Sequence, residues 1–258
     1  MRYCLIKRYA LISKCSGERV IRFLSAIVLG CGIVWGSAVA APQTQNTAPI
    51  QTSLQRQDAL QRISDWRALI SESSHLSDHE KLRRVNDFFN RTIRYGEDID
   101  IWKKADYWAS PMETLEMGMG DCEDFALAKF FTLQQLGIAD SHLRMVYATQ
   151  TSTQQAHMVL GYWADADAQP VVLDNLENAI LPIAQRNDLA VRFAFDELGL
   201  YSFDHERLQR VSGVGQLPNW QPLLQRAKRE EAEVAANQAN GTPPNLMMSA
   251  LRTTEPKR

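Results

Sequence analysis

The feature that most constrains the fold is a change of hydrophobic period near Gly137. Before this glycine, apolar residues recur at helical spacing, as in residues 54–70 and 122–135. After it, apolar and polar residues alternate along three short segments, and the last two have the pattern of a β-hairpin with a polar loop. These expected strands are residues 143–150, 157–163 and 170–176. Helices that precede an antiparallel sheet predict an α+β domain.

Capping and turn residues mark the ends of the helices. The capping box Ser77–Glu80 predicts the start of a second helix. Gly118 and Gly120 break the chain immediately before the helix over residues 122–135. Residues 97–117, between these two helices, are predicted to be irregular.

Residues 1–40 have the composition of a secretory signal peptide. Six basic residues and one acidic residue precede an apolar run that ends in the small residues Ala38 and Ala40. We therefore expect export and cleavage after residue 40. An uncleaved membrane anchor and a lipoprotein modified at Cys31 are the alternatives.

Composition divides the rest of the chain into three parts. Residues 41–53 are polar and predict a flexible lead-in, whereas residues 54–222 predict one globular domain. Residues 223–258 begin as a charged, alanine-rich helix and continue into a polar tail that is expected to be disordered.

Removal of residues 1–40 changes the charge and the cysteine content. Six of the 28 basic residues and one of the 30 acidic residues leave, so the net charge falls from −2 to about −7. An acidic chain is a poor partner for nucleic acid, so no nucleic acid is expected to bind. Only Cys122 remains of four cysteines, which excludes an internal disulfide and leaves one free thiol.

Cys122 is a candidate nucleophile because it follows a glycine-rich turn at a predicted helix N-terminus, where unpaired N–H groups favour a thiolate. A nucleophilic thiol needs a base and a group that orients the base. His157 opens the first strand of the hairpin and Asp174 lies in the second. Paired opposite each other, both side chains would lie on one face and face the helix of Cys122. Taken singly, each residue also has an ordinary structural explanation.

The stretch "DYWASPMETLEMGMGDCEDFALAKFFTLQQLGI", together with "AHMVLGYW" and "VVLDNL", resembles the bacterial transglutaminase-like cysteine proteinases, periplasmic proteases of the LapG type. The resemblance extends from about residue 60 to residue 204. It implies a papain-like, transglutaminase-like fold and a cysteine endopeptidase located in the periplasm. It also implies that Cys122 is the nucleophile, His157 the general base and acid, and Asp174 the residue that orients His157.

Three acids flank the thiol, namely Asp121, Glu123 and Asp124. Their negative charges disfavour a nearby thiolate, and a hard cation such as Ca2+ would offset them. From the residues alone, the acids could equally be ordinary helix N-terminal residues. The resemblance implies a calcium-dependent enzyme with Asp121 and Glu123 among the ligands, and Asp124 is a further candidate.

The resemblance also implies a substrate and a regulator. The substrate is the N-terminal region of a large cell-surface adhesin, cut at a paired-alanine site so that cells leave a biofilm. The regulator is the periplasmic domain of an inner-membrane cyclic-di-GMP receptor. The alternatives are a cell-wall peptide amidase, a transglutaminase-type acyl transferase, and a calcium-binding adaptor without catalytic activity.

Overall fold

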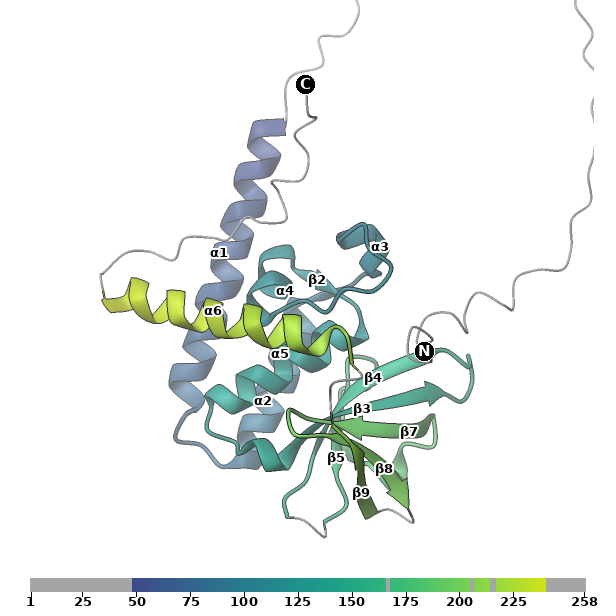
Figure 1. The fold of residues 1–258 in the computed structure, drawn as a ribbon. Helices are drawn as coiled ribbons and strands as arrows, with labels where there is room; N and C mark the ends of the chain where they lie inside the picture. Colours follow the sequence, from purple (N-terminus) through teal and green to yellow (C-terminus); the bar gives the residue numbers. More distant parts are fainter. Residues whose placement is uncertain (1–47, 166–167, 205–206, 214–216, 240–258) are drawn as a thin grey trace, which may run out of the picture.

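Helix α5 (Cys122–Gln135) lies between a β-sheet and the other helices (Figure 1). The computed structural model describes residues 48–165, 168–204, 207–213 and 217–239. The expected signal peptide and the tail beyond Ala239 lie outside these ranges. Within them, no helix combines the length and the apolar character that crossing a membrane requires.

Four helices of two or more turns surround α5, and α3 is a single turn. Helix α1 packs on α2 and α4, while α2 and α4 both pack on α5. Their bounds are α1 Ala48–Ser73, α2 Asp78–Thr92, α3 Asp98–Ile101, α4 Pro111–Met117 and α6 Trp220–Ala239. Short 3-10 turns cover Asp140–His142 and Ile183–Gln185.

The described residues form a seven-stranded antiparallel sheet with the order β6-β5-β4-β3-β7-β8-β9. The strands are β3 Leu143–Gln150, β4 Ala156–Tyr162, β5 Val171–Leu173, β6 Leu181–Pro182, β7 Leu189–Phe195, β8 Leu200–Asp204 and β9 Arg207–Ser212. The predicted α+β class is confirmed, and β3 has the predicted bounds. A separate parallel pair joins β1 (Arg94–Tyr95) to β2 (Met119–Gly120).

The two faces of the sheet bury two separate hydrophobic clusters. The larger cluster includes Phe125, Met158 and Leu160 and fills the space between the sheet and the helices. Val159 and Val172 belong to a smaller cluster on the opposite face. Because successive side chains of a strand point to opposite faces, this division fixes which residues of β4 face α5.

The prediction that residues 97–117 are irregular is wrong, because they contain α3 and α4. Helix α4 begins with a capping box in which Ser110 accepts a bond from the Glu113 N–H and the Glu113 carboxylate accepts one from the Ser110 N–H. Pro111 occupies its first position, where a proline costs no hydrogen bond. These start signals are present in the sequence, but they lie outside any apolar period.

Both expected domain boundaries shift. Helix α1 begins at Ala48, so residues 48–53 of the predicted lead-in are helical. Helix α6 is not a separate segment that follows residue 222. Its residues Trp220, Leu223 and Leu224 are buried in the larger cluster, so the first turns of α6 belong to the domain.

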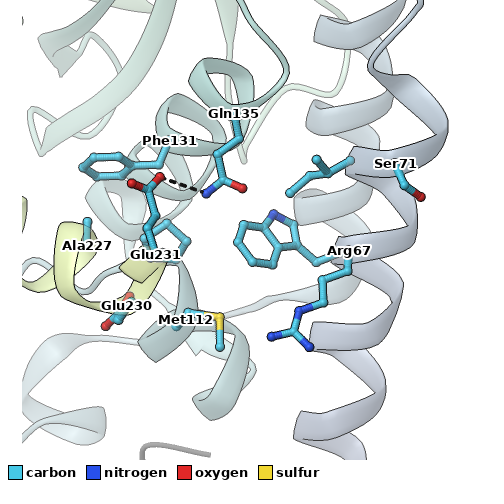
Figure 2. A pocket seen from close by; sticks show the side chains of 11 residues that line it. Arg67, Ser71, Met112, Phe131, Gln135, Ala227, Glu230 and Glu231 are labelled. Atoms are coloured by element: carbon cyan, nitrogen blue, oxygen red, sulfur yellow. Dashed lines mark hydrogen bonds between the residues drawn. The ribbon is translucent and has the colours of Figure 1, made fainter. Parts of the chain in front are cut away.

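A cavity of about 420 Å³ lies where α6 passes over α1, α4 and α5 (Figure 2). Its apolar wall includes Trp66, Met112 and Phe131, and charged residues of α6 lie at its margin. Gln135 donates a hydrogen bond to Glu231 across it (3.4 Å). The cavity adjoins the C-terminal half of α5, whereas Cys122 begins that helix.

The carboxyl group of Glu230 should make the stability of the domain pH-dependent. Ser110 donates to it (2.6 Å), but burial raises its pKa to about 7. Between pH 4.5 and 7 the folded state retains a proton that the unfolded state loses, so stability falls as pH rises. Glu230→Gln should therefore be more stable than the wild type at pH 8, by up to about 3 kcal/mol, with little difference at pH 4.5. Urea denaturation at both pH values measures the free energy of unfolding. Glu231→Gln, a change at the exposed neighbouring residue, is the control, and an equal gain of stability in that variant would contradict the prediction.

Candidate active site

The turn before Cys122 is held by β1 and β2. The N–H of Gly96 donates to the carbonyl of Gly120 (3.0 Å), which fixes the chain at the point where α5 begins. Gly118 has a φ of 62°, a conformation that favours glycine. A side chain at position 120 would lie 2.7 Å from the Asp124 side chain, so this glycine permits the close packing of the turn on α5.

The Cys122 thiol is partly buried at the start of α5. It donates a hydrogen bond to the Glu123 carboxylate (3.0 Å) and accepts one from the backbone N–H of Met158. Burial raises the pKa of the thiol well above its usual value, and the charges of Glu123 and Asp121 raise it further. The thiol therefore contacts β4 one residue from His157, in surroundings that favour its protonated form.

His157 and Asp174 form a buried pair. The His157 ring nitrogen Nε2 lies 2.8 Å from Oδ1 of Asp174, and both residues are almost inaccessible to solvent. Burial alone would raise the pKa of Asp174, but its contacts with His157, the Leu176 N–H and Arg186 outweigh burial and hold that pKa well below its usual value. The carboxylate therefore stays ionised and can fix the orientation of the imidazole.

The predicted register of the hairpin is wrong by two residues. The structure pairs Leu160 with Leu173, so continuing this register places Val159, and not His157, opposite Asp174. An even shift keeps the two side chains on one face, as diagonal neighbours, which is why their contact still forms. The loop between Tyr162 and Val171 does not specify the register, because its length permits several pairings.

The prediction that the pair faces the helix of Cys122 is supported by one contact, that of the thiol with the N–H of Met158. His157 alternates with Met158 along β4, and Met158 belongs to the cluster that faces α5. His157 directly precedes the residue whose N–H the thiol contacts, at the end of β4 that lies next to the start of α5. The thiol reaches β4 through the intervening Met158 N–H.

Arg186 is a buried residue that sequence reasoning missed. Its Nη2 donates to Oδ2 of Asp174 (2.6 Å) and to Oδ2 of Asp188 (2.7 Å). Its Nε donates to Oδ1 of Asp188 (2.9 Å). Arg186 lies after a short 3-10 turn that brings it back over the end of β5. No sequence signal placed it there, because the contact depends on the path of the chain between β5 and β7.

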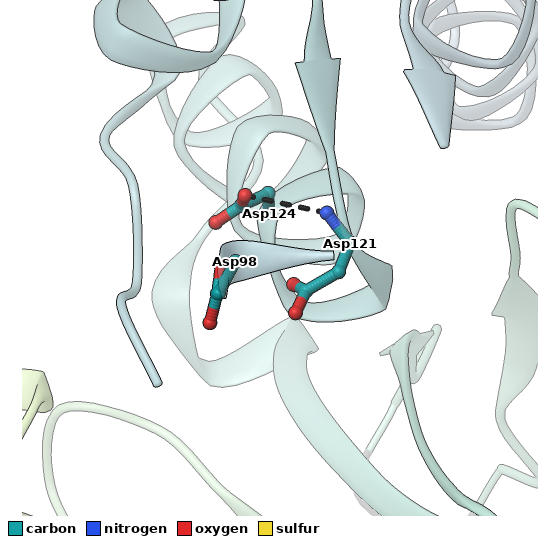
Figure 3. Close-up of side chains that lie close together, drawn as sticks. All are labelled: Asp98, Asp121 and Asp124. Carbon is teal, nitrogen blue, oxygen red and sulfur yellow. Dashed lines mark hydrogen bonds between the residues drawn. The ribbon is translucent and has the colours of Figure 1, made fainter. Parts of the chain in front are cut away.

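Buried carboxylates gather at the start of α5 (Figure 3). Oxygens of Asp98, Asp121 and Asp124 lie within 4.8 Å of one another, and a second such group joins Asp98 to Asp106 and Glu123. The N–H groups of Ala109 and Asp121 donate to Asp124 (2.8 and 3.4 Å). Burial, with the charge of Glu123, nevertheless raises the pKa of Asp124 well above its usual value.

This set of oxygens fits a hard cation. Buried carboxylates close to one another are costly unless a positive charge offsets them, and Ca2+ prefers several carboxylate and carbonyl oxygens. The structure brings Asp121 and Asp124 together, as expected, and places Glu123 in the adjoining group. Asp98 and Asp106 were missed because they lie in the segment that was predicted to be irregular.

Comparisons with known proteins show the family to which the chain belongs. The family model of the bacterial transglutaminase-like cysteine proteinases matches residues 55–189. The chain belongs to this family. The match spans Cys122, His157, Asp174 and Arg186. A comparison with curated proteins gives no match.

Solved structures of a family member are similar in sequence and fold. Legionella pneumophila LapG is 33% identical, with a TM-score of 0.59, over 69% of this chain and 96% of that chain. An EGTA-treated form of that protein gives a TM-score of 0.60 over the same shares of both chains. Its calcium-bound form is 34% identical, with a TM-score of 0.58, over 69% of this chain and 97% of that one.

Arg186→Met should destabilise the protein by about 3 kcal/mol, because it removes the guanidinium partner of the buried Asp174 carboxylate. Asp188→Ala is the matched control, since its side chain is 59% exposed and an exposed pair contributes less than about 1 kcal/mol. Chemical denaturation of both variants measures the difference. Equal losses of unfolding free energy in the two variants would show that the contact of Arg186 with Asp174 does not stabilise the fold more than the exposed pair does.

Proposed function

We propose that this protein is a calcium-dependent cysteine endopeptidase in which Cys122, His157 and Asp174 form the catalytic triad. The observation that carries the proposal is the contact of the thiol with the N–H of Met158, the residue next to His157, whose ring is paired with a buried aspartate. Membership of a cysteine proteinase family supports the same chemistry.

The reaction begins when His157 takes the thiol proton and the sulfur of Cys122 attacks the carbonyl carbon of a peptide bond. The tetrahedral intermediate collapses to a thioester as His157 gives its proton to the leaving amine. Water, deprotonated by His157, then attacks the thioester and releases the acid and the thiol. Asp174 fixes the ring orientation throughout. The Cys122 N–H at the start of α5 donates to the oxyanion.

An aromatic surface beside the thiol supports a peptide substrate. Tyr147 is paired with Met158 across β3 and β4, and Phe193 is paired with Tyr147 on the other side. Their rings stack with centroids 4.9 Å apart, and both side chains are only partly buried. This surface lies on the face of the sheet that Met158 shares, next to the nucleophile.

The buried acids would hold the calcium ion. Asp98, Asp121 and Asp124 form its centre, with Glu123 and Asp106 at its margin. When bound, the ion supplies positive charge that offsets these carboxylates. Glu123 accepts a hydrogen bond from the thiol, and a role in holding the ion would compete with that hydrogen bond.

The biological role that we propose follows the family resemblance. The protein is exported to the periplasm, where it cuts the N-terminal region of a large cell-surface adhesin at a paired-alanine site and so promotes biofilm dispersal. The periplasmic domain of an inner-membrane cyclic-di-GMP receptor controls it by sequestration.

Cys122→Ala should abolish cleavage, with a loss of at least about 1000-fold in kcat, because no other residue can form the acyl-enzyme. Residues 41–258 are incubated with adhesin N-terminal fragments, and the products are identified by mass spectrometry. Ser141→Ala, an exposed change on the same domain, is the control. Wild-type cleavage by the Cys122 variant would refute the proposal, and digestion of peptidoglycan in place of the fragment would favour an amidase.

Removal of calcium should lower both activity and stability. EGTA leaves the buried acids uncompensated, so we expect cleavage to fall to background and Tm to drop by several degrees, with recovery after excess Ca2+ is added. Asp98→Asn should weaken calcium binding at least tenfold in calorimetry. Unchanged Tm and activity in EGTA would remove calcium from the mechanism.

A further inference from the structure

Lys129 is a fully buried lysine that the proposed reaction does not use. It follows Cys122 by seven residues, or two helical turns, so both side chains lie on one side of α5. Its Nζ donates to Oδ1 of Asn86 (2.8 Å) and to the backbone carbonyl of Asp174 (3.0 Å). Burial lowers the pKa of Lys129 to about 7, which shows how unfavourable this location is for a charge.

Two asparagines of α2 complete the network around the same backbone. Asn90 donates to the carbonyl of Asp174 (2.7 Å) and to Oδ1 of Asn178 (2.7 Å). Asn86 donates to the carbonyl of Asn178 (3.0 Å). Asn86 and Asn90 are one turn apart, so both point from α2 toward the turn formed by residues 174–178.

This turn needs support because β5 ends at Leu173. Beyond that residue, the sheet contributes no ladder bonds to hold the backbone of Asp174. The carbonyl of Asp174 receives its two bonds from side chains of α5 and α2, while Arg186 and His157 hold the carboxylate of the same residue.

We propose that Lys129, Asn86 and Asn90 are positioning residues for the triad. They fix the backbone of Asp174 from the helical side, and Asp174 in turn sets the orientation of His157. Helix α5 then determines both the place of the nucleophile and, through Lys129, the place of the aspartate. The proposal rests on the catalytic roles assigned above to Cys122, His157 and Asp174.

The decisive variant is Lys129→Met, which keeps the length of the side chain and removes the charge. Replacing a buried charge by an apolar group of similar size is often neutral or stabilising, so a structural role and a positioning role predict different results. We expect an unchanged or higher Tm, a fall in kcat of about 10- to 100-fold, and a KM within about twofold of the wild type. Asn90→Ala should show the same separation of kcat from KM.

The matched control on α5 is Thr132→Val. Thr132 is buried, lies one turn from Lys129, and accepts a hydrogen bond from the Trp66 ring (2.8 Å) with no contact to the turn. The control on α2 is Asp87→Ala, which removes an exposed pair with Arg83. Both controls should keep kcat, even where Tm falls.

Steady-state cleavage of an internally quenched peptide with a paired alanine, and thermal denaturation, are measured for each variant in saturating Ca2+. If Cys122→Ala is inactive while Lys129→Met and Asn90→Ala retain the kcat of their controls, the positioning role is overturned and the proposed function stands. If losses of kcat in all variants simply follow losses of Tm, the network is structural and the positioning role fails. A wild type indistinguishable from Cys122→Ala overturns both.

Discussion

The burial of α5 is the constraint on which the rest of the structure depends. Nearly every residue from Glu123 to Leu133 is inaccessible to solvent, because the sheet covers one side of the helix and α2 and α4 cover the other. Burial of its apolar side chains supplies the free energy that keeps the helix in place. The thiol, an acid of the proposed cation site and the buried lysine are all carried by this one helix, so their relative positions are set together.

Two groups of buried acids near α5 are stabilised in different ways. Asp174 has an internal partner, Arg186, and a pKa well below its usual range. Asp124, by contrast, has a pKa well above its usual range although two backbone N–H groups donate to it. The first group has its counter-charge within the chain, whereas the second has the close carboxylate oxygens that a hard cation would fit. This difference explains why an external cation would affect the start of α5 and leave the histidine–aspartate pair in place.

Local sequence signals predicted the elements that depend on them. Residues 122–135 and 143–150 show clear helical and alternating periods, and α5 and β3 have those bounds. Contacts between distant segments could not be predicted in the same way. The loop between β4 and β5 permits several registers, so the direct opposition of His157 and Asp174 was wrong although their contact forms. Asp98 and Arg186 approach the site only through the path of the folded chain.

Buried polar residues that weaken a simple core are expected where function requires them. In the part of the chain that the structure describes, Lys129, Asp124, Asp174 and Arg186 are such residues, and each contacts either the turn at Asp174 or the acids beside the thiol. An apolar core would avoid the free-energy cost of burying these polar groups, but it would not fix the direction of a carboxylate or an imidazole. The arrangement around α5 therefore fits the positioning role proposed above.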